Sequence, residues 1–348
     1  MAIVLPDGLL QNTTVGYVRQ WLRANACVDA VVSLPQETFI PYGTGIKTSI
    51  LFLRKKPSPS RPCFMARVRV IGYDVKGQPL HRKTPDGQLV LADNGRPILD
   101  DETPEVAAAF SARTTSGDRT FLVNQRDFNS RLDVEHYLPS DLLLLKRLEE
   151  SGALPLTSIA SFAAPSRSWR DDPEAGIRYV AISDIDPRTM EIVNVQAMRA
   201  HEAPSRATYV LREGDIVSAV SGASTGTRKH ATAMARTETE GAVCSNGLAV
   251  LRDIRGVEPL YLLAYLRTDV FLRQVRRLMT GHAIPSISLD DLGTVRVPIP
   301  PADVQARVIE KVQKLRALRR RAMEQSDVVV DTLNDVMAPL TTLGATSR

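Results

Sequence analysis

One stretch, residues 284–337, most constrains how this chain can fold. A short apolar strand at 294–297 leads into residues 298–301 (PIPP), whose prolines lack N–H donors and therefore end the strand. Asp303 can cap a following helix, because its carboxylate can accept hydrogen bonds from the unpaired amides of the first turn. No proline or glycine intervenes before Pro339, so we expect a helix of roughly 50 Å at 1.5 Å per residue.

The expected helix carries apolar residues at a spacing of seven, with some polar residues on the half-step. This pattern is typical of a coiled coil or a long helix pair. Packing of the helix on its own domain is the alternative, but four arginines on its other faces favour a rod that separates two bodies. We expect the pairing face to contain Val308, Leu315, Leu318, Ala322 and Val329, and Val304 and Val336 extend the same lines.

Composition narrows the class of protein. With 348 residues the chain suits about two domains, and its net charge of +5 favours a polyanionic partner. Cys27, Cys63 and Cys244 lie far apart in the sequence, so neither a disulfide framework nor a zinc knot is expected. No apolar run reaches membrane-spanning length and the N-terminus does not resemble a secretion signal, which predicts a cytoplasmic protein without a membrane partner.

The N-terminal segment indicates part of an α/β sheet. Apolar strands are expected at 2–5, 28–34 and 47–53, with a helix at 14–25. The near-continuous apolar character of the strands indicates burial on both faces. Glycine turns near residues 77, 87 and 95 predict β-hairpins over residues 66–99, and a polar stretch at 111–118 precedes the main domain boundary.

This segment resembles the later part of the catalytic domain of N6-adenine DNA methyltransferases, the modification subunits of type I restriction systems. The resemblance spans residues 2–125 and rests on "IVLPDGLL", "VDAVVSLPQETFIPYGTGIKTSILFLRK" and "GQLVLADNGRPILDDETPEVAAAF". In that family the cofactor-binding glycine motif and the Asn/Asp-Pro-Pro-Tyr/Phe catalytic motif lie upstream, and neither motif occurs in this sequence. The resemblance implies a methyltransferase ancestor or partner, with no cofactor in this chain and S-adenosylmethionine only in a complete enzyme.

The C-terminal half indicates an α+β body. A helix is expected at 140–150, strands at 178–185, 209–221 and 242–251, and an amphipathic helix at 258–280. The segments "YVAISDI", "LREGDIVSAVSGASTG" and "NGLAVLR", with the closing "IPSISLDDLGTVRVPIPPADVQARVI", resemble the target-recognition domains of type I restriction specificity subunits. In that family a long spacer helix follows the closing phrase.

Together these features predict an α/β and α+β chain with a partial Rossmann-like methyltransferase sheet, a target-recognition domain and a long C-terminal spacer helix. We place the methyltransferase portion at 1–125, a linker and helix at 126–152, the recognition domain at 153–302 and the spacer helix at 303–338.

The segment 222–230 is the strongest candidate for DNA contact. Hydroxyl groups, cationic side chains and glycine amides are the groups that bind DNA phosphates. From this region we select Ser221, Ser224, Thr225, Arg228, Lys229 and His230, and from flanking loops Arg167, Arg170, Arg188 and Arg206. An ordinary solvated turn is the alternative. The histidines show no metal-ligand spacing, and no catalytic constellation is evident in the sequence.

Three functional hypotheses remain open. The first is a specificity module of a restriction-modification system that binds double-stranded DNA and pairs through its long helix with a second copy or with a methyltransferase subunit. The second is the C-terminal fragment of a split adenine methyltransferase that is active only with an N-terminal partner chain. The third is a protein-interaction scaffold with no role at DNA.

Overall fold

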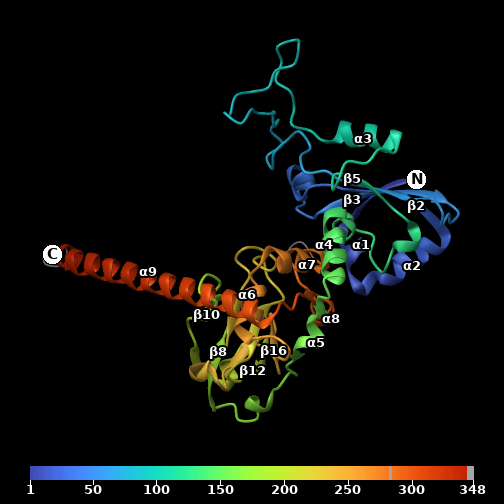
Figure 1. Ribbon diagram of the computed structural model, residues 1–348. Coiled ribbons are helices and arrows are strands. Elements are labelled where there is room, and N and C mark those ends of the chain that lie inside the picture. The colour runs from blue at the N-terminus through green and yellow to red at the C-terminus, as the bar shows by residue number, and fades with distance from the viewer. Residues whose placement is uncertain (282–283, 343–348) are drawn as a thin grey trace. The chain divides into compact units, whose positions relative to one another are not determined.

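The computed structural model describes residues 1–281 and 284–342, which divide into two compact units (Figure 1). The first unit comprises Met1–Ser151 and Arg273–Leu292. The second unit comprises Gly152–Leu272 and the described residues from Gly293 onward. A segment late in the sequence therefore packs with the N-terminal part of the chain, and the domain limits proposed from the sequence stay predictions.

A five-stranded mixed sheet forms the centre of the first unit, in the order β1-β3-β2-β4-β5. Its members are β1 (Ala2–Pro6), β2 (Ala26–Ser33), β3 (Thr48–Lys55), β4 (Cys63–Arg67) and β5 (Thr120–Val123). β2 pairs antiparallel with β3 and parallel with β4. Separate apolar clusters around Val31 and Phe64 cover the two faces of the sheet, which explains why β2 is apolar almost throughout. The predicted α/β sheet is confirmed.

Four α-helices belong to the N-terminal part of the first unit. They are α1 (Asp7–Gln11), α2 (Gly16–Asn25), α3 (Thr103–Ala112) and α4 (Pro139–Glu150). Val106 of α3 and Leu22 of α2 pack on opposite apolar clusters. The helices expected at 14–25 and 140–150 are therefore present, within one or two residues at their ends.

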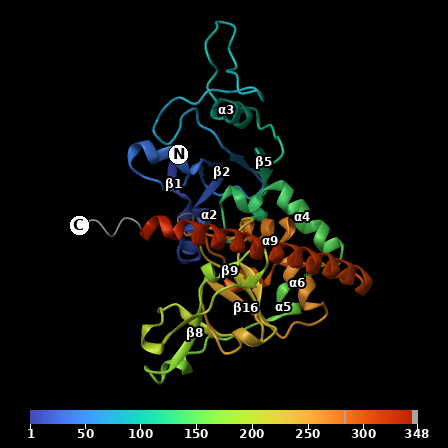
Figure 2. The same cartoon turned by 90° about the vertical axis from the view of Figure 1, so that its left-hand side faces the viewer.

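The predicted hairpins form an arm between β4 and α3, which projects from the first unit in both views (Figure 1 and Figure 2). Isolated bridges join Tyr73 to Pro79, Lys83 to Leu89, and Leu91 to Pro97. Gly77, Gly87 and Gly95 occupy the three turns with φ of 77°, 84° and 74°. A side chain is strained at such angles, so the glycines account for the turns that the sequence predicted.

The second unit contains two four-stranded sheets, in the orders β11-β8-β15-β12 and β14-β13-β16-β7. The first comprises β8 (Gly176–Val180), β11 (Gln196–Arg199), β12 (Ala207–Val210) and β15 (Val243–Ser245). The second comprises β7 (Ser161–Phe162), β13 (Ile216–Ala219), β14 (Thr232–Met234) and β16 (Leu248–Arg252). Two short pairs complete it: β9 (Ile185–Asp186) with β10 (Glu191–Ile192), and β6 (Leu154–Pro155) with β17 (Arg296–Val297).

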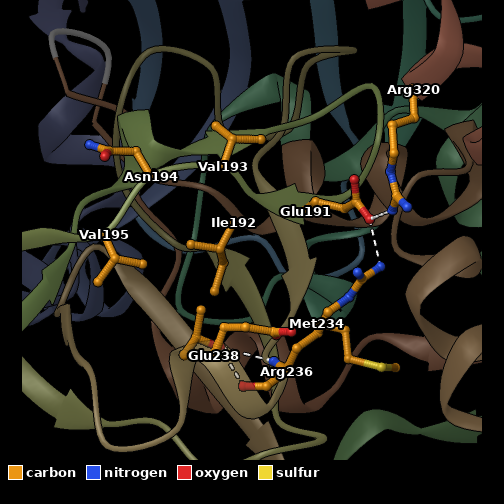
Figure 3. Close-up of a pocket in the computed structure, with 10 residues that line it drawn as sticks. Glu191, Ile192, Val193, Asn194, Val195, Met234, Arg236, Glu238 and Arg320 are labelled. Carbon is orange, nitrogen blue, oxygen red and sulfur yellow. Dashed lines mark hydrogen bonds and ion pairs between the residues drawn. The ribbon is translucent and has the colours of Figure 1, made fainter. Parts of the chain in front are cut away.

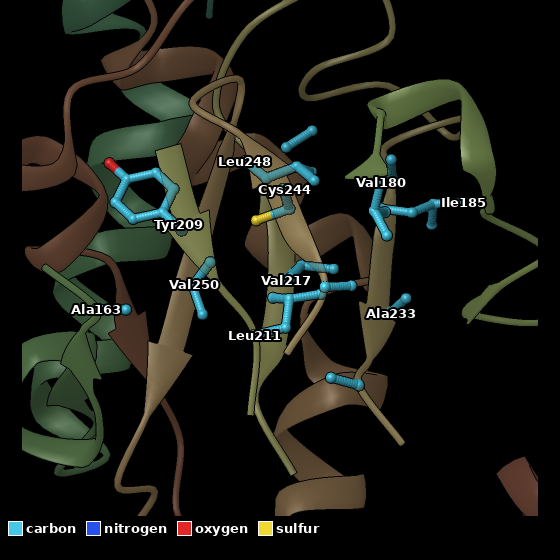
Figure 4. Close-up of a cluster of buried hydrophobic side chains, with 14 residues drawn as sticks. Ala163, Val180, Ile185, Tyr209, Leu211, Val217, Ala233, Cys244, Leu248 and Val250 are labelled. Atoms are coloured by element: carbon cyan, nitrogen blue, oxygen red, sulfur yellow. The ribbon is translucent and has the colours of Figure 1, made fainter. Parts of the chain in front are cut away.

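An apolar core joins both sheets of the second unit (Figure 4). Cys244 and Val180 contribute from one sheet, and Val217 and Val250 contribute from the other. All four side chains are at most 1% exposed. The α+β body expected from the sequence is confirmed, and its strands hold the connecting loops on a rigid frame.

The amphipathic helix expected at 258–280 is wrong in one respect, because the chain forms two helices there. They are α6 (Pro259–Tyr265) and α7 (Asp269–Leu278). Between them Thr268 donates from its hydroxyl to the Tyr265 carbonyl at 2.7 Å and accepts from the Phe271 amide at 3.3 Å. This side-chain competition for backbone groups ends one helix and begins the next.

The long C-terminal helix is confirmed as α9 (Ala302–Thr342), preceded by α5 (Leu156–Ile159) and α8 (Leu289–Gly293). Its 41 residues correspond to about 60 Å at 1.5 Å per residue. Asp303 lies inside the first turn and pairs with Arg307. None of the helices in the described parts of the chain combines the length and apolarity that crossing a bilayer requires.

The proline-rich phrase before α9 anchors that helix to α6. Gln305 is 6% exposed; it donates to the Pro300 carbonyl at 2.9 Å and accepts from the Glu258 amide at 3.0 Å. The Tyr261 hydroxyl donates to the Pro298 carbonyl at 2.8 Å. These bonds satisfy buried polar groups at the start of both helices, which explains the glutamine that follows the prolines.

Candidate nucleic-acid interface

The loop that connects β13 to β14 is held by buried hydrogen bonds. We call it the β13–β14 loop (residues 220–231). The His230 side chain is fully buried, and its Nε2 lies 2.9 Å from the Ser218 hydroxyl. The Gly226 amide donates to His230 Nδ1 at 3.1 Å, which places the ring proton on Nε2. Burial, aided by the nearby Arg267 charge, lowers the pKa of His230 to about 3. The neutral imidazole therefore holds the loop closed.

Arg267, between α6 and α7, holds the same loop by its backbone. Its guanidinium donates to the Arg228 carbonyl at 2.6 Å and also to the His230 carbonyl. Burial lowers the pKa of Arg267, and the charge of Arg319 on α9 adds to this effect. Because Arg267 engages carbonyl groups, it leaves the side chain of Arg228 free to face solvent.

The six residues selected from this region differ in the exposure of their side chains. Arg228 and Lys229 are exposed, and Ser221 and Ser224 are half-buried. Thr225 and His230 are buried at 1% and 0%, so their predicted contact with a ligand needs correction. They support the loop from beneath. Residues 230–233 are all buried, so no alternation of exposure along β14 could have placed His230 inside from the sequence.

Arg167, Arg170 and Arg206 gather on a second part of the unit. Arg170 stacks on Trp169 at 4.4 Å and donates to the Pro204 carbonyl at 2.9 Å. The Arg206 Nε donates to the Tyr179 hydroxyl at 3.3 Å, and the Arg167 side chain is exposed. Arg170 is thus occupied by structural contacts, whereas Arg167 and Arg206 present charge to solvent.

The turn Asn246–Gly247 links these arginines to the β13–β14 loop. The Asn246 amide donates to the Arg206 carbonyl at 2.7 Å, and the Val220 amide donates to the Gly247 carbonyl at 2.8 Å. A Cβ atom on Gly247 would lie 2.6 Å from Ile182 Cδ1, so glycine allows this turn to pack against the end of the Ile182 side chain. The structure thereby brings the Arg206 region and the start of the loop to the same turn.

A cluster of charges, which sequence reasoning missed, joins α9 to the β9–β10 hairpin. Glu191 accepts from Arg236 at 2.5 Å and also from Arg320, as Figure 3 shows. It also accepts from Arg316 at 2.9 Å. Arg236 and Arg320 also line a cavity of about 420 Å³ beside Glu191. We call these four residues the Glu191 cluster. Its members are far apart in the sequence, so no local pattern could reveal it.

Arg188 occupies the turn of the same hairpin. Its side chain is 70% exposed and its Nε donates to Asp186 at 3.3 Å. Arg319 of α9 donates to the Arg188 carbonyl at 2.6 Å. The predicted contact residue Arg188 therefore lies beside α9, at a place that the sequence did not indicate.

The predicted pairing face of α9 is largely open. Leu315, Leu318 and Val329 are 46%, 56% and 59% exposed, and Ala322 is also exposed. Val308 is half-buried. The side chain of Val336 lies outside the described residues. Exposed apolar side chains at this spacing leave the predicted helix pairing available, and the pairing stays a prediction.

The first unit holds an ion network at the carboxyl ends of β1 and β2. Lys47 donates to Asp7 at 2.7 Å, to Glu135 at 3.0 Å and to the Ser33 hydroxyl at 2.7 Å. Ser49 donates to Asp7 at 2.6 Å. Burial alone would lower the pKa of Lys47, but Glu135 and Asp7 outweigh burial and raise it. Lys47 is consequently a fixed cation that neutralises buried carboxylates.

These polar groups satisfy one another, and no glycine-rich cofactor loop accompanies them in the sequence. The residues present therefore do not fit S-adenosylmethionine, and we derive no methyl-transfer step from them. The described residues also contain no group of three or more histidine, cysteine or carboxylate side chains that could hold a metal ion. Cys27, Cys63 and Cys244 are free and buried, and burial raises the pKa of Cys244 to about 12, which makes it a poor nucleophile.

Comparison with known proteins places the chain beside restriction-modification proteins. Residues 1–82 match the family described as N-6 DNA Methylase. No curated protein matches the chain. Among solved structures, the chain is similar to the HsdS subunit from Thermoanaerobacter tengcongensis, with 28% identity and a TM-score of 0.42, covering 54% of this chain and 47% of that one.

Two further solved structures show similarity. One is the type I restriction-modification methyltransferase subunit from Streptococcus thermophilus, with 21% identity and a TM-score of 0.28, covering 40% of this chain and 26% of that one. The other is the type IIG restriction endonuclease BpuSI, with 10% identity and a TM-score of 0.39, covering 90% of this chain and 42% of that one. This chain spans less than half the length of each of these three proteins. The family match confirms the methylase resemblance over residues 1–82.

Proposed function

We propose that the second unit is a target-recognition module that binds double-stranded DNA sequence-specifically within a restriction-modification system. The observation that carries this proposal is the β13–β14 loop, where Arg228 and Lys229 are exposed above a base fixed by His230 and Arg267. Cationic side chains bind phosphates, and a rigid loop base limits the entropy that is lost on binding. The net charge of +5 and the relation to restriction-modification proteins support the same function.

Sequence selection would come from side chains that reach base edges around this loop. Arg206 and Arg167 lie on the neighbouring part of the unit, and the serines at 221 and 224 are half-buried beside the loop. Arginine hydrogen-bonds the two acceptors of guanine in the major groove, whereas serine accepts or donates to several bases. The loop therefore combines cations that can bind phosphates with arginine and serine side chains that can bind base edges. This combination suits recognition of one DNA half-site.

The test is fluorescence anisotropy with labelled duplex pools. We expect the double variant Arg228→Ala, Lys229→Ala to weaken binding at least tenfold, because two phosphate contacts are lost. The matched control is Lys146→Ala, Arg147→Ala on α4, which removes the same charge from exposed positions of the first unit. If the two double variants lose the same affinity, the binding depends only on net charge. If the wild-type chain binds all duplexes with equal affinity, specific recognition is refuted.

The exposed apolar residues of α9 support pairing with a second copy or with a methyltransferase subunit. Replacing Leu315 by glutamate should abolish such pairing, because a charge would enter the apolar seam. Light scattering after gel filtration measures the mass of the assembly, with and without a methyltransferase subunit. Gln313→Glu, an exposed polar position on the same helix, is the control. A wild-type chain that stays monomeric with every partner would refute the pairing.

The second candidate function is that of a C-terminal methyltransferase fragment that acts only with an N-terminal partner chain. The edge position of β1 favours it, since β1 pairs with β3 on one side and exposes Ile3 and Val4 at 37% and 48%. Such an edge can accept a strand from another chain. Co-expression with a chain that carries the cofactor and Asn/Asp-Pro-Pro-Tyr/Phe motifs tests it, by co-purification and by adenine methylation of plasmid DNA. Failure of both would exclude this function.

A further inference from the structure

We infer that the N-terminal half of α9, together with the β9–β10 turn, forms a second phosphate-binding surface for duplex DNA. This inference rests on the proposed function and extends it from the β13–β14 loop to the spacer helix. A helix that serves only as a spacer needs apolar contacts with its partner. It needs no arginines on the face that lies against its own unit. α9 instead has arginines 316, 319 and 320 in contact with the hairpin. The last two follow the first by three and four positions, so all three lie on one side of the helix.

The loop and the arginines of α9 lie near one another in the second unit. β14 connects them, since it begins just after His230 and leads to Arg236 in the Glu191 cluster. Both strands of the β9–β10 hairpin pack against β14. Arg267, which holds the loop, lies close enough to Arg319 for the two charges to interact. A DNA backbone that contacts Lys229 would therefore continue toward α9.

The charge of this surface is not balanced within the protein. Five arginines, at positions 188, 236, 316, 319 and 320, surround the carboxylates of Glu191 and Asp186. Glu238 lines the cavity beside Glu191, so the arginines exceed the carboxylates by two. Arg319 donates to a backbone carbonyl, so this bond leaves its positive charge uncompensated. Positive charges gathered on one face attract a polyanion over a range of about 8–10 Å at physiological salt.

The geometry of the exposed groups suits phosphate better than a small organic ligand. Arg188, Arg236 and Arg320 have side chains that are 70%, 51% and 48% exposed. Arg236 and Arg320 border the open cavity beside Glu191, as Figure 3 shows. A planar guanidinium binds two phosphate oxygens through parallel hydrogen bonds. Several guanidinium groups close together can bind successive phosphates of a duplex. The DNA backbone would then extend from the β13–β14 loop to α9.

Arg319 gives the cleanest test, because its bond goes to a carbonyl and its loss leaves the Glu191 cluster intact. We would measure the binding constant for a duplex of unrelated sequence between 50 and 300 mM salt. Each lost phosphate contact lowers the slope of log K against log[salt] by about 0.9. Arg319→Ala with Arg188→Ala should therefore lower the slope by about 1–2 and weaken binding at low salt, with sequence preference unchanged.

The controls separate charge from folding. Arg319→Lys keeps the charge and should keep the slope. Arg307→Ala removes an arginine nine positions before Arg316, on the opposite side of α9, and should leave the slope unchanged. A wild-type slope in the Arg188, Arg319 double variant, alongside a reduced slope for Arg228→Ala, Lys229→Ala, would overturn this inference alone. A wild-type protein that binds no duplex would overturn the proposed function itself.

Discussion

Replacing Glu191 by glutamine tests how firmly α9 is held on the second unit. Arg236 and Arg320 are about half exposed, so each of their pairs with Glu191 contributes only about 0.2–1 kcal/mol. Arg316 is 11% exposed, and burial lowers its pKa. Breaking a buried pair costs about 3–5 kcal/mol, and the residual exposure of this site reduces that to about 2–3 kcal/mol. We expect Glu191→Gln to lose this much stability.

Urea unfolding at low salt measures the loss, and hydrogen exchange of residues 312–324 locates it. Exchange in this part of α9 should accelerate in Glu191→Gln, because the helix loses its attachment to the hairpin. Arg320→Ala is the control: it keeps the Glu191–Arg316 pair and should cost less than about 1 kcal/mol. Equal effects of the two substitutions, or a Glu191→Gln protein as stable as the wild type, would refute this reasoning.

Three further predictions concern buried groups. Acidification from pH 7 to pH 5 should destabilise the second unit by on the order of 2 kcal/mol: His230 has a pKa of about 3 when folded and about 6.5 when unfolded, so protons bind preferentially to the unfolded chain below pH 6.5. His230→Gln should flatten this pH dependence in chemical unfolding. Gly247→Ala should destabilise the unit by about 0.5–1.5 kcal/mol in the same assay, because the half-buried Ile182 side chain must leave its rotamer to admit the new Cβ. Gln305→Ala should cost about 1–3 kcal/mol by leaving the Glu258 amide without its partner, whereas Gln313→Ala on the exposed side should cost almost nothing.

Local patterns in the sequence were enough to predict the main elements. The absence of proline and glycine after residue 301 predicted α9, and the glycine turns predicted the hairpin arm. The apolar strands predicted a sheet buried on both faces. These features depend on residues that are near neighbours in the chain, where hydrogen bonding and backbone angles act directly. The break between α6 and α7 was missed because Thr268 also fits an amphipathic helix.

Contacts between distant segments could not be predicted in this way. Lys47 meets Asp7 and Glu135 across 40 and 88 positions, and Glu191 meets Arg316 across 125. Nothing in the spacing of these residues indicates their proximity, since the topology of the sheets decides it. The sequence pattern placed the arginines of α9 on faces away from the apolar seam and gave them no partner, whereas three of them contact the β9–β10 hairpin. The candidate site was located by composition, and its buried supports were recognised only in the structure.

Selection from a random duplex library shows whether the second unit recognises a DNA sequence. The full chain, with its methyltransferase partner where one is required, would be incubated with the library at physiological salt, and the retained DNA would be sequenced. We predict enrichment of one short motif by the wild-type chain. The double variant Arg228→Ala, Lys229→Ala should lose this enrichment, and the double variant Lys146→Ala, Arg147→Ala should keep it. Retained DNA with the composition of the input library would contradict a role in sequence recognition.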